Sequence, residues 1–156
     1  MMRHTLLMVG RLSRPFFRDA AEEYLRRLEG YSRPKLVSVS EADGRDPGRA
    51  RELEGESLLA TADRLGTGYW VALDEGGKMS TSKGLAAFLK NRGVGGDSQI
   101  VWFIGGAYGL SDEVKRRCAL VLSLSRMTFP HEMVPVIILE QIYRAHRIIR
   151  GEPYHH

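Results

Sequence analysis

The sequence predicts an α/β domain built on a largely parallel sheet of five or six strands. Short runs rich in branched and aromatic residues alternate along the whole chain with longer segments whose apolar residues recur at helical spacing. One short run, Gln99–Ile104, is apolar without interruption after its first residue, as is typical of a strand buried on both faces of a parallel sheet. Because no repeat, low-complexity tract or linker interrupts this alternation, we expect residues 1–156 to form a single domain.

Local signals set the expected ends of the elements. Gly30, Gly66 and Gly93 each follow a helical pattern and are expected to stop it. The sequence DEGGK at residues 74–78 is expected to turn the chain after a strand. The expected strands are Arg3–Val9, Lys35–Ser40, Tyr69–Leu73, Gln99–Ile104 and Leu120–Leu124. The first three expected helices are Pro15–Leu28, Ala50–Leu65 and Thr81–Asn91. A short helix capped by Ser111 is expected to run to Arg117, and a last helix to end at Arg150, before Gly151 and Pro153.

Composition narrows the class of protein. Of the 156 residues, 43% are apolar and 27% charged, as in a soluble globular protein, and neither a membrane span nor a signal peptide is recognisable. The single cysteine, Cys118, excludes an internal disulfide, so we expect a cytoplasmic protein in which this thiol packs as a small apolar group. The net charge of +4 permits an anionic partner without requiring one.

A glycine-rich turn, Gly105–Gly109, follows the strand Gln99–Ile104. Ligands of open α/β sheets bind at the carboxyl ends of strands, so the position suits a ligand. The turn has neither the phosphate-binding GxxxxGK[ST] pattern nor GxGxxG, and Asp112 and Glu113 at the next helix start would repel a phosphate. A ligand without phosphate therefore fits better, and a purely structural tight turn remains the alternative.

The segment from Leu124 to His131 is the more specific signal. An apolar strand breaks there into a loop rich in hydrogen-bonding groups, which Pro130 prevents from pairing further. Such a loop can surround a planar base, with backbone groups reading its edge and Met127 or Phe129 packing on its face. A plain strand-to-helix connection is the alternative.

These motifs, with HTLLMVGRL at the start and RGEPYHH at the end, resemble the RlmH family of the SPOUT superfamily over the full length. The resemblance implies a SPOUT-type α/β fold with a deep C-terminal trefoil knot. It also implies methyl transfer from S-adenosylmethionine to N3 of a pseudouridine in large-subunit (23S) rRNA, on the assembled ribosome and by a homodimer. The five histidines show no metal-ligand spacing, and we expect no metal, membrane or DNA partner.

The resemblance also implies site residues. Arg144 and the tail residues Tyr154 and His155 are implied to be catalytic, with His155 a base or proton relay and Arg144 able to stabilise a developing anion. From the sequence alone, Arg144 stands among apolar neighbours and needs a partner: a carboxylate, an RNA phosphate or the carboxyl group of a cofactor. The residues implied to line the methyl-donor pocket are Leu73, Gly105, Leu124, Ser125, Arg126, Met127, Thr128 and Phe129.

The last helix is apolar on more than one face, since Val136, Ile137 and Ile148 add to its main stripe. A subunit interface would bury the extra faces, as the resemblance implies; deep burial within one subunit is the alternative.

One departure from the family concerns Pro135, which stands where the family has arginine, four residues after His131. Proline is tolerated if the last helix begins there as its first residue. The loss of that cation keeps a non-catalytic ribosome- or RNA-binding protein as the main alternative function. A different nucleotide-dependent α/β enzyme is a weaker alternative, because the phosphate-loop pattern is missing.

Overall fold

The computed structural model describes residues 1–154. Five strands form one sheet in the order β2-β1-β4-β3-β5, and all four neighbouring pairs are parallel. This confirms the predicted parallel α/β fold; the trefoil knot stays a prediction. The strands are β1 (Arg3–Val9), β2 (Arg33–Val39), β3 (Tyr69–Met79), β4 (Gln99–Ile104) and β5 (Leu120–Ser123); the helices are α1 (Pro15–Leu28), α2 (Pro47–Arg64), α3 (Ser82–Val94), α4 (Asp112–Arg117) and α5 (Met133–Ile149).

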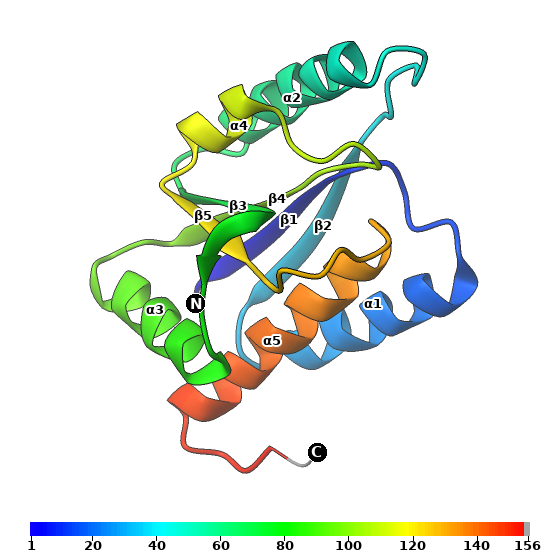
Figure 1. The fold of residues 1–156 in the computed structure, drawn as a ribbon. Coiled ribbons are helices and arrows are strands. Elements are labelled where there is room, and N and C mark those ends of the chain that lie inside the picture. The colour runs from blue at the N-terminus through cyan, green and yellow to red at the C-terminus, as the bar shows by residue number, and fades with distance from the viewer. Residues whose placement is uncertain (155–156) are drawn as a thin grey trace.

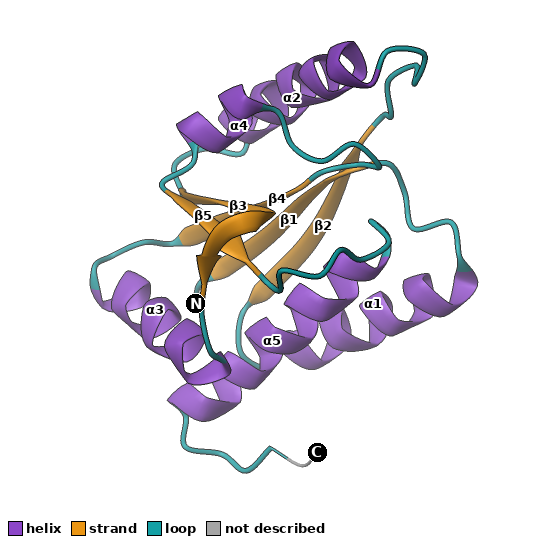
Figure 2. Cartoon of the chain, viewed as in Figure 1, coloured by secondary structure: helices purple, strands orange, loops and turns teal. Residues whose placement is uncertain are grey.

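The sheet lies between two helical layers. Helices α1, α3 and α5 cover one face, and α2 and α4 cover the other (Figures 1 and 2). The alternation of side chains along β4 divides the core in two: Ile100, Trp102 and Ile104 pack toward the first layer, Val101 and Phe103 toward the second. All six residues of β4 are buried, as the uninterrupted apolar run predicted.

Strand β3 is longer than predicted. We expected it to end at Leu73 and the chain to turn over residues 74–78, but the strand continues to Met79. Leu122 of β5 pairs with Leu73 and again with Lys78, so residues 74–77 bulge out within the strand. Glycine is required at Gly77, because a Cβ there would lie 2.6 Å from the carbonyl oxygen of Val121.

Most other differences lie at element ends. β2 includes Pro34, which is tolerated because β2 is an edge strand. α2 begins at Pro47 because Asp46 caps it, and α3 continues through Gly93.

The last helix begins at Met133, two residues earlier than the start expected at Pro135. Pro135 is its third residue, where a backbone N–H has no partner within the helix, so the proline costs no hydrogen bond.

A pair of buried histidines joins the sheet to α5. His4 on β1 is fully buried; its Nδ1 accepts a hydrogen bond from Trp102 Nε1 at 3.2 Å, and its Nε2 lies 2.9 Å from Nε2 of His146. Because Nδ1 accepts, the neutral His4 carries its proton on Nε2 and donates it to His146. Burial lowers the pKa of His4 to about 3 and that of His146 to about 4.

This pair predicts a loss of stability in mild acid. Unfolded histidines take up protons as the pH falls through about 6.5, whereas His4 and His146 stay neutral in the folded state until the pH approaches 4. The free energy of unfolding, measured with urea, should therefore be highest above pH 6.5. Between pH 6.5 and 5 this free energy should fall by about 1.4 kcal/mol per pH unit for each histidine that is protonated in the unfolded state but not in the folded state. His146→Phe should reduce this slope, whereas a free energy of unfolding that is level from pH 8 to 5 would contradict the assignment.

Candidate active site

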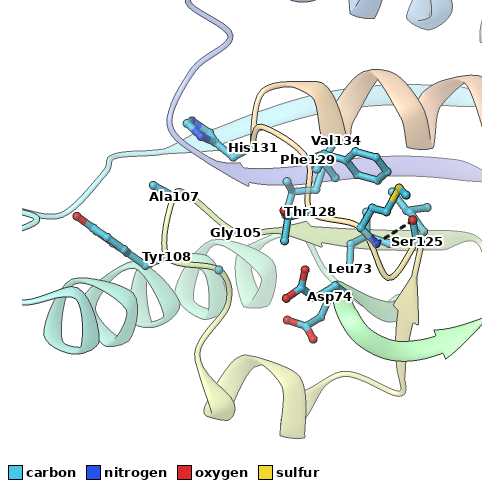
Figure 3. A pocket seen from close by; sticks show the side chains of 16 residues that line it. Leu73, Asp74, Gly105, Ala107, Tyr108, Ser125, Thr128, Phe129, His131 and Val134 are labelled. Carbon is cyan, nitrogen blue, oxygen red and sulfur yellow. Dashed lines mark hydrogen bonds between the residues drawn. The ribbon is translucent and has the colours of Figure 1, made fainter.

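A cavity of about 390 Å³ opens at the carboxyl end of β4 and beside the bulge of β3. The glycine turn that follows β4 forms one side, and the segment that follows β5 forms another (Figure 3). Seven of the eight residues predicted for the methyl-donor pocket line it together: Leu73, Gly105, Leu124, Ser125, Met127, Thr128 and Phe129. The eighth, Arg126, is not among the residues that line it.

The glycine turn is folded tightly onto itself. Gly109 donates its N–H to the carbonyl oxygen of Gly106 at 3.1 Å and has a φ of +79°, which favours glycine. A Cβ on Gly105 would lie 2.5 Å from the carbonyl carbon of Gly109. Any side chain at Gly105 would therefore force the turn open.

The segment from Leu124 to Glu132 has its own internal supports. Ser123 Oγ donates to the carbonyl oxygen of Ser125 at 2.9 Å, and Ser125 Oγ accepts from the N–H of Met127 at 3.0 Å. Arg126 donates from its guanidinium to the carbonyl oxygen of Glu75 in the bulge of β3. Arg126 thus fastens the segment to β3, which explains why its side chain does not line the cavity.

The far end of the segment is held by Glu132. One carboxylate oxygen accepts from the backbone N–H of Ser13 at 2.5 Å and of Arg14 at 3.1 Å; the other accepts from Ser13 Oγ at 3.0 Å. Desolvation raises the pKa of Glu132, but the hydrogen bonds from Arg14 and Ser13 outweigh it and leave that pKa below its usual value. Glu132 therefore ties the cavity-lining segment to the start of α1 as a carboxylate.

Sequence reasoning missed several lining residues. Asp74 and Glu75 follow Leu73 directly, and we had assigned them to a turn. Tyr108 and His131 also line the cavity; they belong to the two segments singled out from the sequence but were not among the eight residues named for the pocket. His131 Nε2 lies 3.8 Å from a carboxylate oxygen of Glu41. Asp74 and Glu75 directly follow the expected end of a strand at Leu73, and that position was the signal that could have found them.

Arg144 and Tyr154 lie together at the other end of α5. Arg144 Nε donates to Glu140 Oε1 at 3.0 Å, and Tyr154 Oη donates to the same oxygen at 2.7 Å. The guanidinium carbon of Arg144 lies 3.9 Å from the centre of the Tyr154 ring. Of the three partners expected for Arg144, the structure shows a carboxylate. Burial and then the bond to Glu140 raise the pKa of Tyr154, so its hydroxyl stays protonated and acts as a donor.

These two predicted catalytic residues are not near the cavity of their own chain. Arg144 follows the lining residue Val134 by ten positions, which corresponds to about 15 Å along a helix. In Figure 1 the tail leaves the end of α5 that is remote from the cavity-lining segment. The third predicted residue, His155, lies outside the described residues.

Other chemistries find little support in the part of the chain that the structure describes. It contains no group of three or more His, Cys, Asp or Glu side chains arranged to hold a metal ion. Burial raises the pKa of the Cys118 thiol to about 12, which makes it a poor nucleophile. None of the helices in residues 1–154 is both long and apolar enough to span a bilayer.

Comparison with known proteins identifies the family. A family model described as "Predicted SPOUT methyltransferase" matches residues 2–155. Two proteins named ribosomal RNA large subunit methyltransferase H are each 44% identical to the chain: that of Symbiobacterium thermophilum over 160 residues and that of Gloeobacter violaceus over 156 residues. Each match covers 99% of both proteins.

Solved structures agree at the level of the fold. A probable methylase family protein from Haemophilus influenzae aligns with a TM-score of 0.57 at 10% identity, over 99% of this chain and 70% of that one. A putative methylase family protein from Neisseria gonorrhoeae aligns with a TM-score of 0.55 at 14% identity, over 99% and 85%. With a family model that spans almost every residue and full-length relatives at 44% identity, the chain belongs to the SPOUT methyltransferase family.

Proposed function

We propose that this chain transfers a methyl group from S-adenosylmethionine to N3 of a pseudouridine in 23S rRNA. The reaction would take place on the assembled ribosome in the cytoplasm, and residues 1–156 would act as one domain in a homodimer. The full-length relatives named for large-subunit rRNA methylation support the substrate class. The observation that carries the proposal is the cavity in which the glycine turn and the segment after β5 face each other.

The size and the lining of the cavity suit the methyl donor. Its 390 Å³ lies within the range of about 300–1,000 Å³ found for small-molecule sites. The missing side chain at Gly105 lets the turn fold closely enough to form one side of this cavity. No lysine or arginine is among the lining residues, so the cavity suits a ligand without phosphate.

The residues would divide the work as follows. Bound in the cavity, the donor supplies an electrophilic methyl group on its sulfonium. The glycine turn and residues 124–129 would fix its orientation, and positioning of this kind contributes on the order of 7–11 kcal/mol. Arg144 would stabilise the anion that forms on the target base. Since the Tyr154 hydroxyl stays protonated, removal of the N3 proton would fall to His155.

A second subunit would bring these groups together. Arg144 and the cavity lie at opposite ends of α5 in one chain, so one subunit alone does not assemble them. Helix α5 also keeps apolar surface beyond the core, including Ile148 at 38% exposure. A second copy packed on α5 would bury that surface and place its Arg144 and tail at the cavity of the first.

Methyl transfer to ribosomes tests the activity. We expect labelled S-adenosylmethionine to modify ribosomes that lack the methyl group, and nucleoside mass spectrometry of the digested rRNA to show one N3-methylated pseudouridine. Free 23S rRNA should react weakly, because a chain with a net charge of +4 gains little from phosphate contacts alone. Donor binding without transfer, not restored by Pro135→Arg, would favour the non-catalytic ribosome-binding alternative.

A side chain added at Gly105 in the glycine turn should sharply weaken donor binding. Gly105→Ala places a Cβ against the backbone of Gly109 and should weaken S-adenosylmethionine binding at least about tenfold in calorimetry. Gly30→Ala is the matched control, because its Cβ would meet nothing closer than 3.9 Å. An unchanged affinity in a folded Gly105→Ala protein would place the donor elsewhere.

Mixed dimers test the shared active site. Gly105→Ala and Arg144→Gln homodimers should each be nearly inactive, since one lacks the cavity and the other the arginine. After co-refolding, half of the dimers are mixed, and each mixed dimer has one site with an intact cavity and an intact arginine. Activity should return to about a quarter of the wild-type value. No recovery from well-mixed dimers would mean that cavity and arginine act within one chain.

A further inference from the structure

The charged side chains that line the cavity are of one sign. Asp74 and Glu75 come from the bulge of β3, and neither lysine nor arginine joins them in the lining. In Figure 3 the Asp74 side chain points into the space between the glycine turn and Thr128. We refer to Asp74 and Glu75 together as the acidic wall of the cavity. In a protein of a family that acts on RNA, a polyanion, such a wall favours a ligand with positive charge.

Neighbouring cations neutralise the wall only in part. Asp74 Oδ2 accepts from the N–H of Gly76 at 2.9 Å, and its Oδ1 lies 3.9 Å from Lys115 Nζ. That ammonium is also 3.7 Å from a carboxylate oxygen of Asp112, so one lysine serves two carboxylates. The geometry therefore leaves excess negative charge on Asp74.

Glu75 is less compensated. The Arg126 guanidinium binds its carbonyl oxygen. The Glu75 side chain is exposed, and the carboxylate makes no hydrogen bond or ion pair with another residue of 1–154. His131, on the opposite side of the cavity, has Glu41 as its own carboxylate neighbour. The wall thus carries more negative charge than its surroundings balance.

We propose that Asp74 and Glu75 make the cavity selective for the charged methyl donor over its neutral product. This inference rests on the proposed function. S-adenosylmethionine and S-adenosylhomocysteine share adenine, ribose and amino acid; they differ by one methyl group and by the positive charge on sulfur. A wall of two carboxylates attracts the sulfonium and gives the thioether no equivalent gain.

Such selectivity would favour replacement of the bound product by a new donor after each reaction. After transfer the sulfur has lost its charge, so the attraction of the wall for the ligand disappears and the product leaves a site that a new donor enters. The same attraction favours the bound donor more than the transition state, in which the positive charge is already spreading. Neutralising the wall should therefore weaken donor binding without slowing the transfer step.

Calorimetry on the full chain without RNA tests the proposal. Asp74→Asn keeps an oxygen for the Gly76 N–H, and Glu75→Gln changes no described side-chain bond, so both variants should fold. Each should lower the ratio of donor to product affinity by about three- to tenfold, and the double variant further. Sinefungin, which carries an amine cation in place of the sulfonium, should weaken like the donor. Asp112→Asn removes the same charge beside the same lysine outside the cavity lining and should change the ratio less than twofold.

The outcomes separate the two proposals. If the wild-type chain binds neither donor nor product, the proposed function fails first. If both ligands bind the wild type and lose affinity equally in the variants, the carboxylates contact the shared amino acid and the selectivity proposal is overturned. A ratio that falls as much in Asp112→Asn as in Asp74→Asn would also overturn it, since the effect would then not come from the wall.

Discussion

The candidate site depends on one segment, residues 124–132, which crosses the carboxyl edge of the sheet as neither helix nor strand. Its backbone lacks the regular hydrogen bonds of a helix or a sheet, so its shape must come from hydrogen bonds to other parts of the chain. Arg126 binds the bulge of β3 at one end, and Glu132 binds the start of α1 at the other. Between these two anchors the segment faces the glycine turn and closes the cavity.

The same anchors connect the site to the rest of the fold. The bulge of β3 carries Asp74 and Glu75 into the cavity, and it exists because β3 leaves β5 after Leu73 and rejoins it at Lys78. Directly after Glu132 the chain becomes α5, whose first turn lines the cavity through Val134 and whose far end carries Arg144. One helix thus spans the separation between the cavity and Arg144, and the dimer that we propose would bring the two together.

The parts of this arrangement that depend on neighbours in sequence could be predicted from the sequence. The buried strand β4, the turn at Gly105 and the broken strand after Leu124 all have local signals. The parts that depend on distant pairing could not. Glu132 reaches residues more than a hundred positions away, and the second pairing of Leu122 with β3 follows from the path of the chain and not from the DEGGK pattern. The orientation of the Arg126 side chain, toward the carbonyl oxygen of Glu75 and not into the cavity, follows from the same bulge.

The central claim is that the donor lies between the glycine turn and the segment after β5. Titration of isotope-labelled protein with S-adenosylmethionine, followed by backbone amide NMR, tests it most directly. We expect the largest shifts at Leu73, at residues 105–109 and at residues 124–129, where the ligand would meet backbone groups. Shifts centred instead on the cavity between α2 and α4, near Gly55 and Ser111, would contradict the account.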